Sequence, residues 1–125
     1  MNSYLLVFLG GGIGSVLRLG VYRLTRLWLS SDFPWGTFAV NVIGGFAAGL
    51  VTGWLIARSA GSGETASLFL MTGILGGFTT FSAFSVDAVL MIQRGQQVGA
   101  AMYILASVVF AIIGVVVGLA ATRAG

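Results

Sequence analysis

The sequence predicts an all-α membrane protein with four transmembrane helices. Of its 125 residues, 58% are hydrophobic and only 7% are charged, and the mean hydropathy is +1.04; about a quarter of the residues of a soluble domain are charged. A spanning helix needs about 20 mostly apolar residues, and such windows fit at roughly 3–26, 37–57, 66–92 and 98–121. We expect residues 1–125 to form one transmembrane domain and to keep the first segment, since no basic leader region precedes it.

The residue types that are absent exclude most enzyme classes. The sequence has no Cys and no His, so disulfides, thiol chemistry, imidazole bases and the common zinc sites are excluded together. We therefore do not expect an enzyme. The net charge of +3 comes from six arginines against three acidic residues, and the arginines lie at segment ends, a distribution typical of membrane flanks and not of nucleic-acid binding.

The first predicted span contains a small-residue pair and a charge. Gly10 and Gly14 form a G-x-x-x-G pair, which lets another helix approach closely. Arg18 follows four residues later. An arginine inside a span marks a functional site, or it extends its side chain to the membrane boundary. Both interpretations of Arg18 stay open.

The second predicted span has one strongly polar side chain, Asn41. Together with Gly45, Gly49 and Gly53 it repeats every four residues, which predicts a common helix face with a single amide at its head. The amide either makes a hydrogen bond between helices or offers the two hydrogens of its NH2 group to an anion.

The stretch from Gly73 to Asp87, GILGGFTTFSAFSVD, predicts a break near the middle of the third span. Adjacent glycines followed by two β-branched threonines weaken a helix, and non-helical backbone at membrane depth must be buried or line a polar cavity. Phe81 and Phe84 follow, interleaved with Ser82 and Ser85. Phenylalanines in a span are usually lipid-facing or core bulk; after a break, their positive ring edges can cradle a small anion. Thr65 and Ser67 are predicted to cap this span at its beginning.

The fourth predicted span carries one polar pair, Tyr103 and Ser107, four residues apart. The two hydroxyl groups can bond to each other or to a partner helix, or they can serve an ion, and the sequence does not decide between these roles. Ala111, Gly114 and Gly118 keep the rest of one face small, which favours close packing.

The distribution of arginines gives only a weak preference for one orientation. With four spans, the two termini share a side. That side has two arginines against three or four on the other, and such a small difference sets orientation weakly. The chain is therefore expected to insert both ways and to pair as an antiparallel dimer, because a bundle of 12.9 kDa is too thin to enclose a path alone. The arginines counted are Arg58 and Arg123 against Arg23, Arg26, Arg94 and, when included, Arg18.

Three ordered motifs on three spans resemble one known family. The motifs are GGGIGSVLR, from Gly10 to Arg18, WGTFAVNVIGG, from Trp35 to Gly45, and GGFTTFSAFS, from Gly76 to Ser85. Over nearly its whole length the chain resembles the Fluc, or CrcB-type, fluoride channels. The resemblance implies an antiparallel dual-topology homodimer in the plasma (inner) membrane, two pores that conduct fluoride passively, and a structural sodium ion at the dimer interface.

The resemblance also assigns roles to residues. Asn41 resembles the pore-lining amide, and Phe81 and Phe84 resemble the rings whose edges line the fluoride path. Gly76 and Thr79 resemble the residues whose carbonyls bind the central Na⁺. The remaining residues that the family pattern places along the pore are Thr80, Ser82, Ser85, Tyr103, Ser107 and, in the vestibule, Arg18.

Two residues near the break depart from the pattern of the family. Ala83 stands where many relatives have a second threonine, so one hydroxyl group is missing beside the expected pore. Asp87 stands where relatives often have Glu. Since a bare carboxylate would repel an anion, Asp87 is expected at a mouth, hydrogen-bonded or paired with arginine.

Two other functions compete with a fluoride channel. Small multidrug-type exporters are also short four-span dual-topology dimers, but they resemble each other in carrying a glutamate within the first span, and this chain has no carboxylate there. In a membrane assembly subunit that transports nothing, Asn41 and the glycines would serve packing alone.

Overall fold

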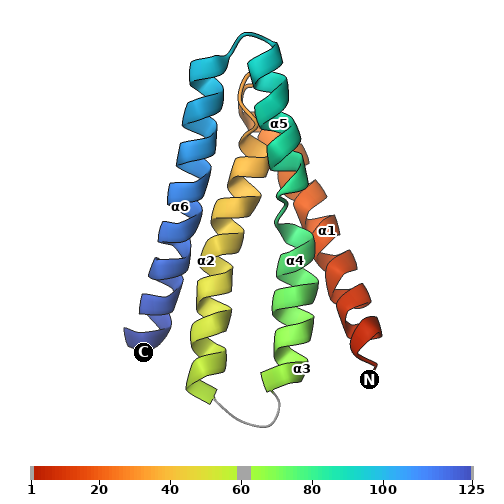
Figure 1. Ribbon diagram of the computed structural model, residues 1–125. Helices are drawn as coiled ribbons and strands as arrows, with labels where there is room; N and C mark the ends of the chain where they lie inside the picture. Colours follow the sequence, from red (N-terminus) through yellow and green to blue (C-terminus); the bar gives the residue numbers. More distant parts are fainter. Residues whose placement is uncertain (1, 59–62, 125) are drawn as a thin grey trace.

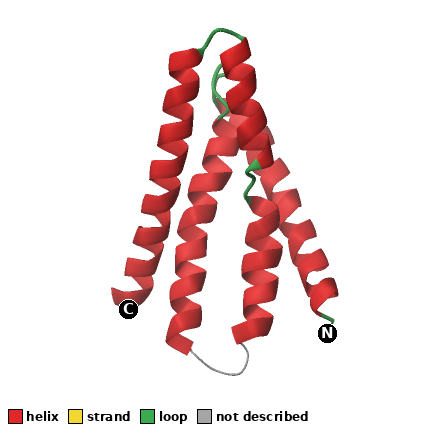
Figure 2. Ribbon diagram, viewed as in Figure 1, coloured by secondary structure: helices red, strands yellow, loops and turns green. Residues whose placement is uncertain are grey.

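The structure, a computed structural model, describes residues 2–58 and 63–124, and its regular elements are all helical (Figures 1 and 2). Within these residues four helical segments are long and apolar enough to cross a membrane, so the chain is a multi-pass membrane protein. The elements are α1 (Ser3–Trp28), α2 (Trp35–Arg58), α3 (Gly63–Ser67), the π-helix η1 (Leu68–Leu75), α4 (Gly76–Phe78), α5 (Ser82–Gln93) and α6 (Gln97–Ala124). The four predicted spans are thereby confirmed, with ends shifted by up to three residues. The third predicted span comprises α3, η1, α4 and α5.

The four spans alternate in direction, so the chain ends marked in Figure 1 lie at the same end of the bundle. Consequently α1 runs parallel to the third span, and α2 runs parallel to α6. Each parallel pair is held together by glycines that let the backbones approach. The predicted linker at 58–65 lies partly outside the described residues.

The α2–α6 pair packs backbone against backbone. A Cβ built on Gly45 would lie 2.5 Å from the Ala111 carbonyl oxygen, and one built on Gly49 would overlap the carbonyl oxygen of Val115. Gly118 meets the backbone of α2 from the other side in the same way. Small residues permit such contact between helices in lipid, where dispersion forces replace the hydrophobic effect as the source of attraction.

The α1–third span pair uses the predicted G-x-x-x-G motif. Gly10 and Gly14 are both buried. A Cβ on Gly10 would lie 2.7 Å from the Phe69 carbonyl oxygen and 3.0 Å from the Cα of Gly73. The expectation that this motif packs against another helix is confirmed, and its partner is η1.

The third span is broken at Thr79–Phe81, as the sequence predicts (Figure 2). Thr79 has an extended backbone, with ψ 161°. Its N–H and its Oγ1 both donate to the Leu75 carbonyl, at 3.0 and 2.9 Å. The Leu75 carbonyl therefore accepts the last two hydrogen bonds before the break. The next helix, α5, begins at Ser82.

Two local features of this span differ from the sequence expectation. Thr65 and Ser67 were predicted as helix caps, but both lie within α3, and Ser67 makes no side-chain capping hydrogen bond. The residues from Leu68 to Leu75 form a π-helix instead of an α-helix. π-Helices are rare, and apolar periodicity gives no signal for an i→i+5 hydrogen-bond pattern.

A hydrophobic core lies where α5 approaches α6 (Figure 1). Its buried residues are Phe84, Ala88, Met91, Ala100 and Tyr103, and two partly buried rings, Phe33 and Phe38, pack against them. Tyr103 is fully buried. The core fixes α5, the part of the third span after the break, against α6. The part before the break, η1 and α4, packs against α1.

Candidate functional site

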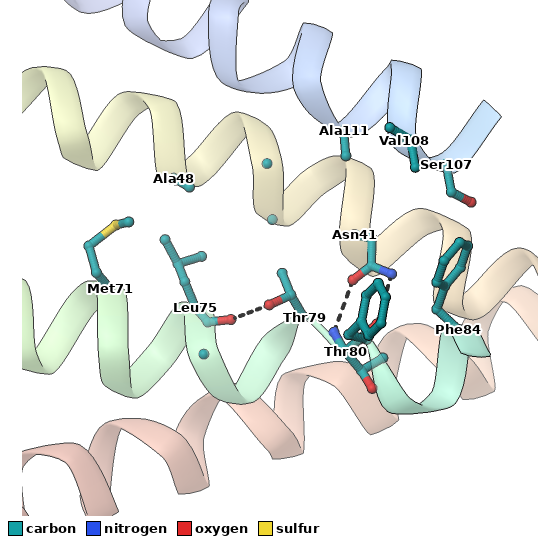
Figure 3. A pocket seen from close by; sticks show the side chains of 14 residues that line it. Asn41, Ala48, Met71, Leu75, Thr79, Thr80, Phe84, Ser107, Val108 and Ala111 are labelled. Atoms are coloured by element: carbon teal, nitrogen blue, oxygen red, sulfur yellow. Dashed lines mark hydrogen bonds between the residues drawn. The ribbon is translucent and has the colours of Figure 1, made fainter. Parts of the chain in front are cut away.

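A cavity of about 410 Å³ opens beside the break, between α2, the third span and α6 (Figure 3). Its walls are contributed by residues far apart in the sequence. The predicted site residues that line it are Asn41, Gly76, Thr79, Thr80, Phe81, Phe84 and Ser107. The structure thus brings into one cavity the amide of the second span, the break of the third and a hydroxyl of the fourth.

Asn41 bonds directly to the broken backbone (Figure 3). Its Oδ1 accepts from the Thr80 N–H at 2.9 Å, and its Nδ2 donates to the Thr80 carbonyl at 3.0 Å. These two bonds fix which end of the amide carries the hydrogens. An amide NH2 has two hydrogens, and the second has no partner among the described residues, so Asn41 both joins the helices and has a donor left for the cavity.

The carbonyls of Gly76 and Thr79 lose their usual helical partners at the break. In a continuous α-helix they would accept from the N–H groups of Thr80 and Ala83. The Thr80 N–H donates to Asn41 instead, and the Ala83 N–H donates to the Thr80 Oγ1 at 3.1 Å. These are the two carbonyls that the family resemblance assigns to Na⁺, and carbonyl oxygen is a suitable ligand for a hard cation.

The two predicted pore rings lie together after the break. The ring centroids of Phe81 and Phe84 are 5.7 Å apart, with planes inclined by 48°. Phe84 is buried in the core, whereas Phe81 is 79% exposed. One ring is therefore fixed by the protein, and the other extends out of the single chain.

Ser107 has an unsatisfied hydroxyl in this cavity. The side chain is 5% exposed, and its Oγ has no hydrogen-bond partner among the described residues. Leaving a buried polar group unpaired costs about 1–3 kcal/mol. A hydrogen-bonding group in the cavity would remove that cost, so the Ser107 hydroxyl is available to one.

Tyr103 and Ser107 are not bonded to each other. The Tyr103 hydroxyl donates to Asp87 Oδ2 at 3.1 Å, which confirms that Asp87 is hydrogen-bonded. Asp87 also lines a second, more polar cavity of about 340 Å³, together with Tyr22, Arg26 and Thr37. That cavity lies at the end of the bundle with the α1–α2 loop. Within the described part of the chain Asp87 makes no ion pair, so the hydrogen-bonded alternative holds.

Besides Tyr103, three predicted site residues lie outside the main cavity. Ser82 is exposed, with its Oγ 3.3 Å from the Thr80 Oγ1. The Ser85 Oγ donates to the Phe81 carbonyl at 2.9 Å, which supports the first turn of α5. Arg18 lies on α1, partly buried, and does not line the cavity. Their predicted roles in a pore stay predictions.

The family of the chain follows from its similarity to known proteins. Residues 5–119 match the family described as CrcB-like protein, Camphor Resistance (CrcB). The chain belongs to this family. It is also 50% identical to a protein of Rhodopseudomonas palustris named Fluoride-specific ion channel FluC, over 98% of both chains. A relative of Rhizobium johnstonii with the same name is 50% identical over 99% of this chain and 98% of its own.

A third CrcB relative, from Nitrobacter hamburgensis, is named Fluoride-specific ion channel FluC 2 and is 46% identical over 97% of both chains. These similarities cover the break, the Asn41 segment and both glycine-packed pairs. Four spanning helices, together with bacterial relatives that are named as ion channels, indicate a multi-pass protein of the plasma membrane.

Among the residues that line the cavity and were not predicted from the sequence is Gly44. A Cβ at this position would overlap the Cγ2 of Thr79. Gly44 therefore lets the break approach α2 closely enough for Asn41 to reach Thr80. The signal was present in the doubled glycine of NVIGG, but only Gly45 fits the four-residue spacing by which the face was predicted.

Proposed function

We propose that this CrcB-family chain is a fluoride-selective channel that exports F⁻ passively across the plasma membrane and so relieves fluoride toxicity. The observation that carries the proposal is the cavity at the helix break, where Asn41, Ser107 and the ring of Phe84 meet. Close relatives named as fluoride-specific channels support it.

The chemistry of the cavity suits a small, strongly hydrated anion. A pore must replace the water that the ion loses with hydrogen-bond donors, because burying an uncompensated charge is very costly. Asn41 and the hydroxyls of Thr80 and Ser107 are neutral donors, and aromatic edges are weakly positive. Neutral donors bind the ion without trapping it, and conduction requires both binding and release.

The working unit in this proposal is an antiparallel dual-topology homodimer. Two exposed groups of the single chain favour it: Phe81 extends out of the chain, and Gly76 lies open beside the break. A second copy would cover both. Reporters active on only one side of the membrane, fused to the C-terminus, test the topology: comparable signal from both sides is expected, and a single orientation for all molecules would reject dual topology.

The proposal includes a structural Na⁺ at the dimer interface. The carbonyls of Gly76 and Thr79 of each copy would hold it, since their usual helical N–H partners bond elsewhere. The ion would neutralise paired carbonyl dipoles and so stabilise the two broken helices against each other. An experimental structure of the dimer should contain a cation with oxygen distances suited to Na⁺, and carbonyls that face away from each other would contradict this part.

A growth assay tests the function itself. Cells that lack their own fluoride exporter should grow in fluoride when they produce the wild-type chain and fail when they produce Asn41→Asp at the same membrane level. Equal growth with both variants would reject the role of Asn41. If the wild type inserts into the membrane but does not restore growth, the channel function is rejected. A multidrug-type exporter would instead protect cells against cationic drugs. The α1 helix carries no carboxylate for that chemistry.

A further inference from the structure

A continuous line of aromatic rings connects the main cavity to the loop between α1 and α2. The ring of Phe81 contacts Phe84, and Phe84 contacts Tyr103 with centroids 5.1 Å apart and planes at 52°. Tyr103 in turn meets Phe33 edge to face, at 5.3 Å and 87°. Phe33 is the member of this line that belongs to the loop, and it does not line the cavity at the break.

Phe33 is itself held on two further sides. Its centroid is 4.5 Å from that of Trp35 and 5.9 Å from that of Phe38, the latter in an edge-to-face arrangement. Trp35 and Phe38 belong to the first turn of α2, and Pro34 directly after Phe33 disfavours the helical backbone conformation at Phe33 itself. The loop therefore presents the Phe33 ring to Tyr103 in a defined orientation.

The orientation of Tyr103 matters because its ring packs against Phe84, a residue in the wall of the main cavity. The side chain is fully buried, so its ring can move only if its neighbours move. One face packs against Phe84, which lines the cavity, and the hydroxyl is fixed by Asp87. Tyr103 is thus clamped between the loop and the cavity wall.

We propose that Phe33 is a positioning residue for the fluoride path: through Tyr103 it sets the angle at which the Phe84 ring edge faces the cavity. The inference rests on the proposed channel function. Phe33 does not contact the ion. Because the attraction between an anion and a ring depends on whether the edge or the face is presented, a tilt of Phe84 changes conduction without removing any donor.

The test replaces Phe33 by Leu, which keeps an apolar side chain but removes the ring. Fluoride efflux per folded protein in liposomes should fall by about three- to tenfold, the rate factor expected when the energy of the Phe33–Tyr103 pair alone is lost from the conduction barrier. Phe33→Tyr keeps the ring and should restore efflux to within about twofold of wild type, because the edge-to-face geometry is retained.

Phe110→Leu is the matched control. Phe110 also makes an edge-to-face contact, with Phe38 at 6.2 Å and 78°, but it does not line the cavity and makes no ring contact with Tyr103 among the described residues. Its loss should leave efflux per folded protein unchanged. If Phe33→Leu fails to assemble, Phe33→Met, a flexible filler without a ring, is measured in the same way.

Two results would overturn the proposal. Either wild-type efflux in Phe33→Leu, or equal loss in Phe33→Leu and Phe110→Leu that follows their thermal stability, would reduce Phe33 to a packing residue. Failure of the wild type to conduct fluoride is a different outcome, because it would reject the channel function and not the ring contact alone.

Discussion

The two faces of α2 make different kinds of contact with the neighbouring helices. One face, with Gly45 and Gly49, packs backbone against backbone on α6 and leaves no room for a side chain, and Gly45 also borders the cavity. The other meets the break through the hydrogen bonds of Asn41 to Thr80 and leaves a cavity of about 410 Å³. The first contact is determined by shape and the second by hydrogen bonding.

This difference indicates how a very small chain can be both rigid and permeable. The glycine contacts of α2 with α6, and of α1 with η1, hold the spans in pairs. Polar groups are then needed only where the pairs meet, at the break. Substitutions in the glycine contacts should therefore change folding, and substitutions at the break should change conduction.

The largest effect should come from the exposed ring beside the break. Phe81→Ile should reduce fluoride efflux from liposomes to near background, because isoleucine has no positive ring edge. Phe81 is 79% exposed in the single chain, so folding of the chain should change little.

Phe8→Ile is its matched control. Phe8 is 75% exposed on α1 and does not line the cavity, so its efflux should equal that of wild type. Equal efflux from wild type and Phe81→Ile would break the distinction between the break and the rest of the apolar surface.

A smaller effect, on stability, is expected at the glycine face. Gly49→Ala should destabilise the protein by about 1–3 kcal/mol through overpacking, although alanine is the better helix former. Gly12→Ala is the control. No atom lies within 4 Å of a Cβ at this position, so the substitution should leave stability unchanged or raise it slightly. Thermal unfolding in detergent measures both, and a Gly49→Ala variant as stable as Gly12→Ala would show that the α2–α6 contact is not tight.

The smallest effect is expected at Gly44. Gly44→Ala overlaps only the Cγ2 of Thr79, which can turn away if the Thr79 Oγ1 gives up its bond to Leu75, a loss of about 1 kcal/mol. Thr79→Ser removes that methyl group and keeps the hydroxyl, so the double variant should recover wild-type stability and efflux. A double variant that is worse than Gly44→Ala would place the clash elsewhere.

The spans, the break and the G-x-x-x-G contact could be predicted because they depend on composition and on residues near one another in sequence. The predicted common face of α2 was only partly right. A step of four residues turns a helix by about 400°, so each step drifts by about 40°. From Asn41 to Gly53 these rotations around the axis of α2 add up. The Asn41 amide therefore contacts Thr80, whereas the glycines contact α6.

The partners of Asn41, Tyr103 and Phe33 could not be predicted, because these contacts join residues that are far apart in the sequence. Asn41 bonds backbone atoms of Thr80, and every residue has such atoms, so no partner could be named. The Tyr103 hydroxyl bonds to Asp87 on α5 and not to Ser107 on its own helix. This bond can be predicted only when the packing of α5 against α6 is known. Phe33 is a loop aromatic whose partner, Tyr103, is known only from the fold.

The most direct test of the account is fluoride efflux from liposomes that contain equal amounts of folded wild type or Asn41→Asp. The carboxylate cannot donate to the Thr80 carbonyl and adds negative charge to an anion path. Wild type should release fluoride rapidly and should not release chloride, whereas fluoride release by Asn41→Asp should be near background. Equal fluoride release by both proteins would contradict the claim that the polar face of α2 at the helix break forms the path.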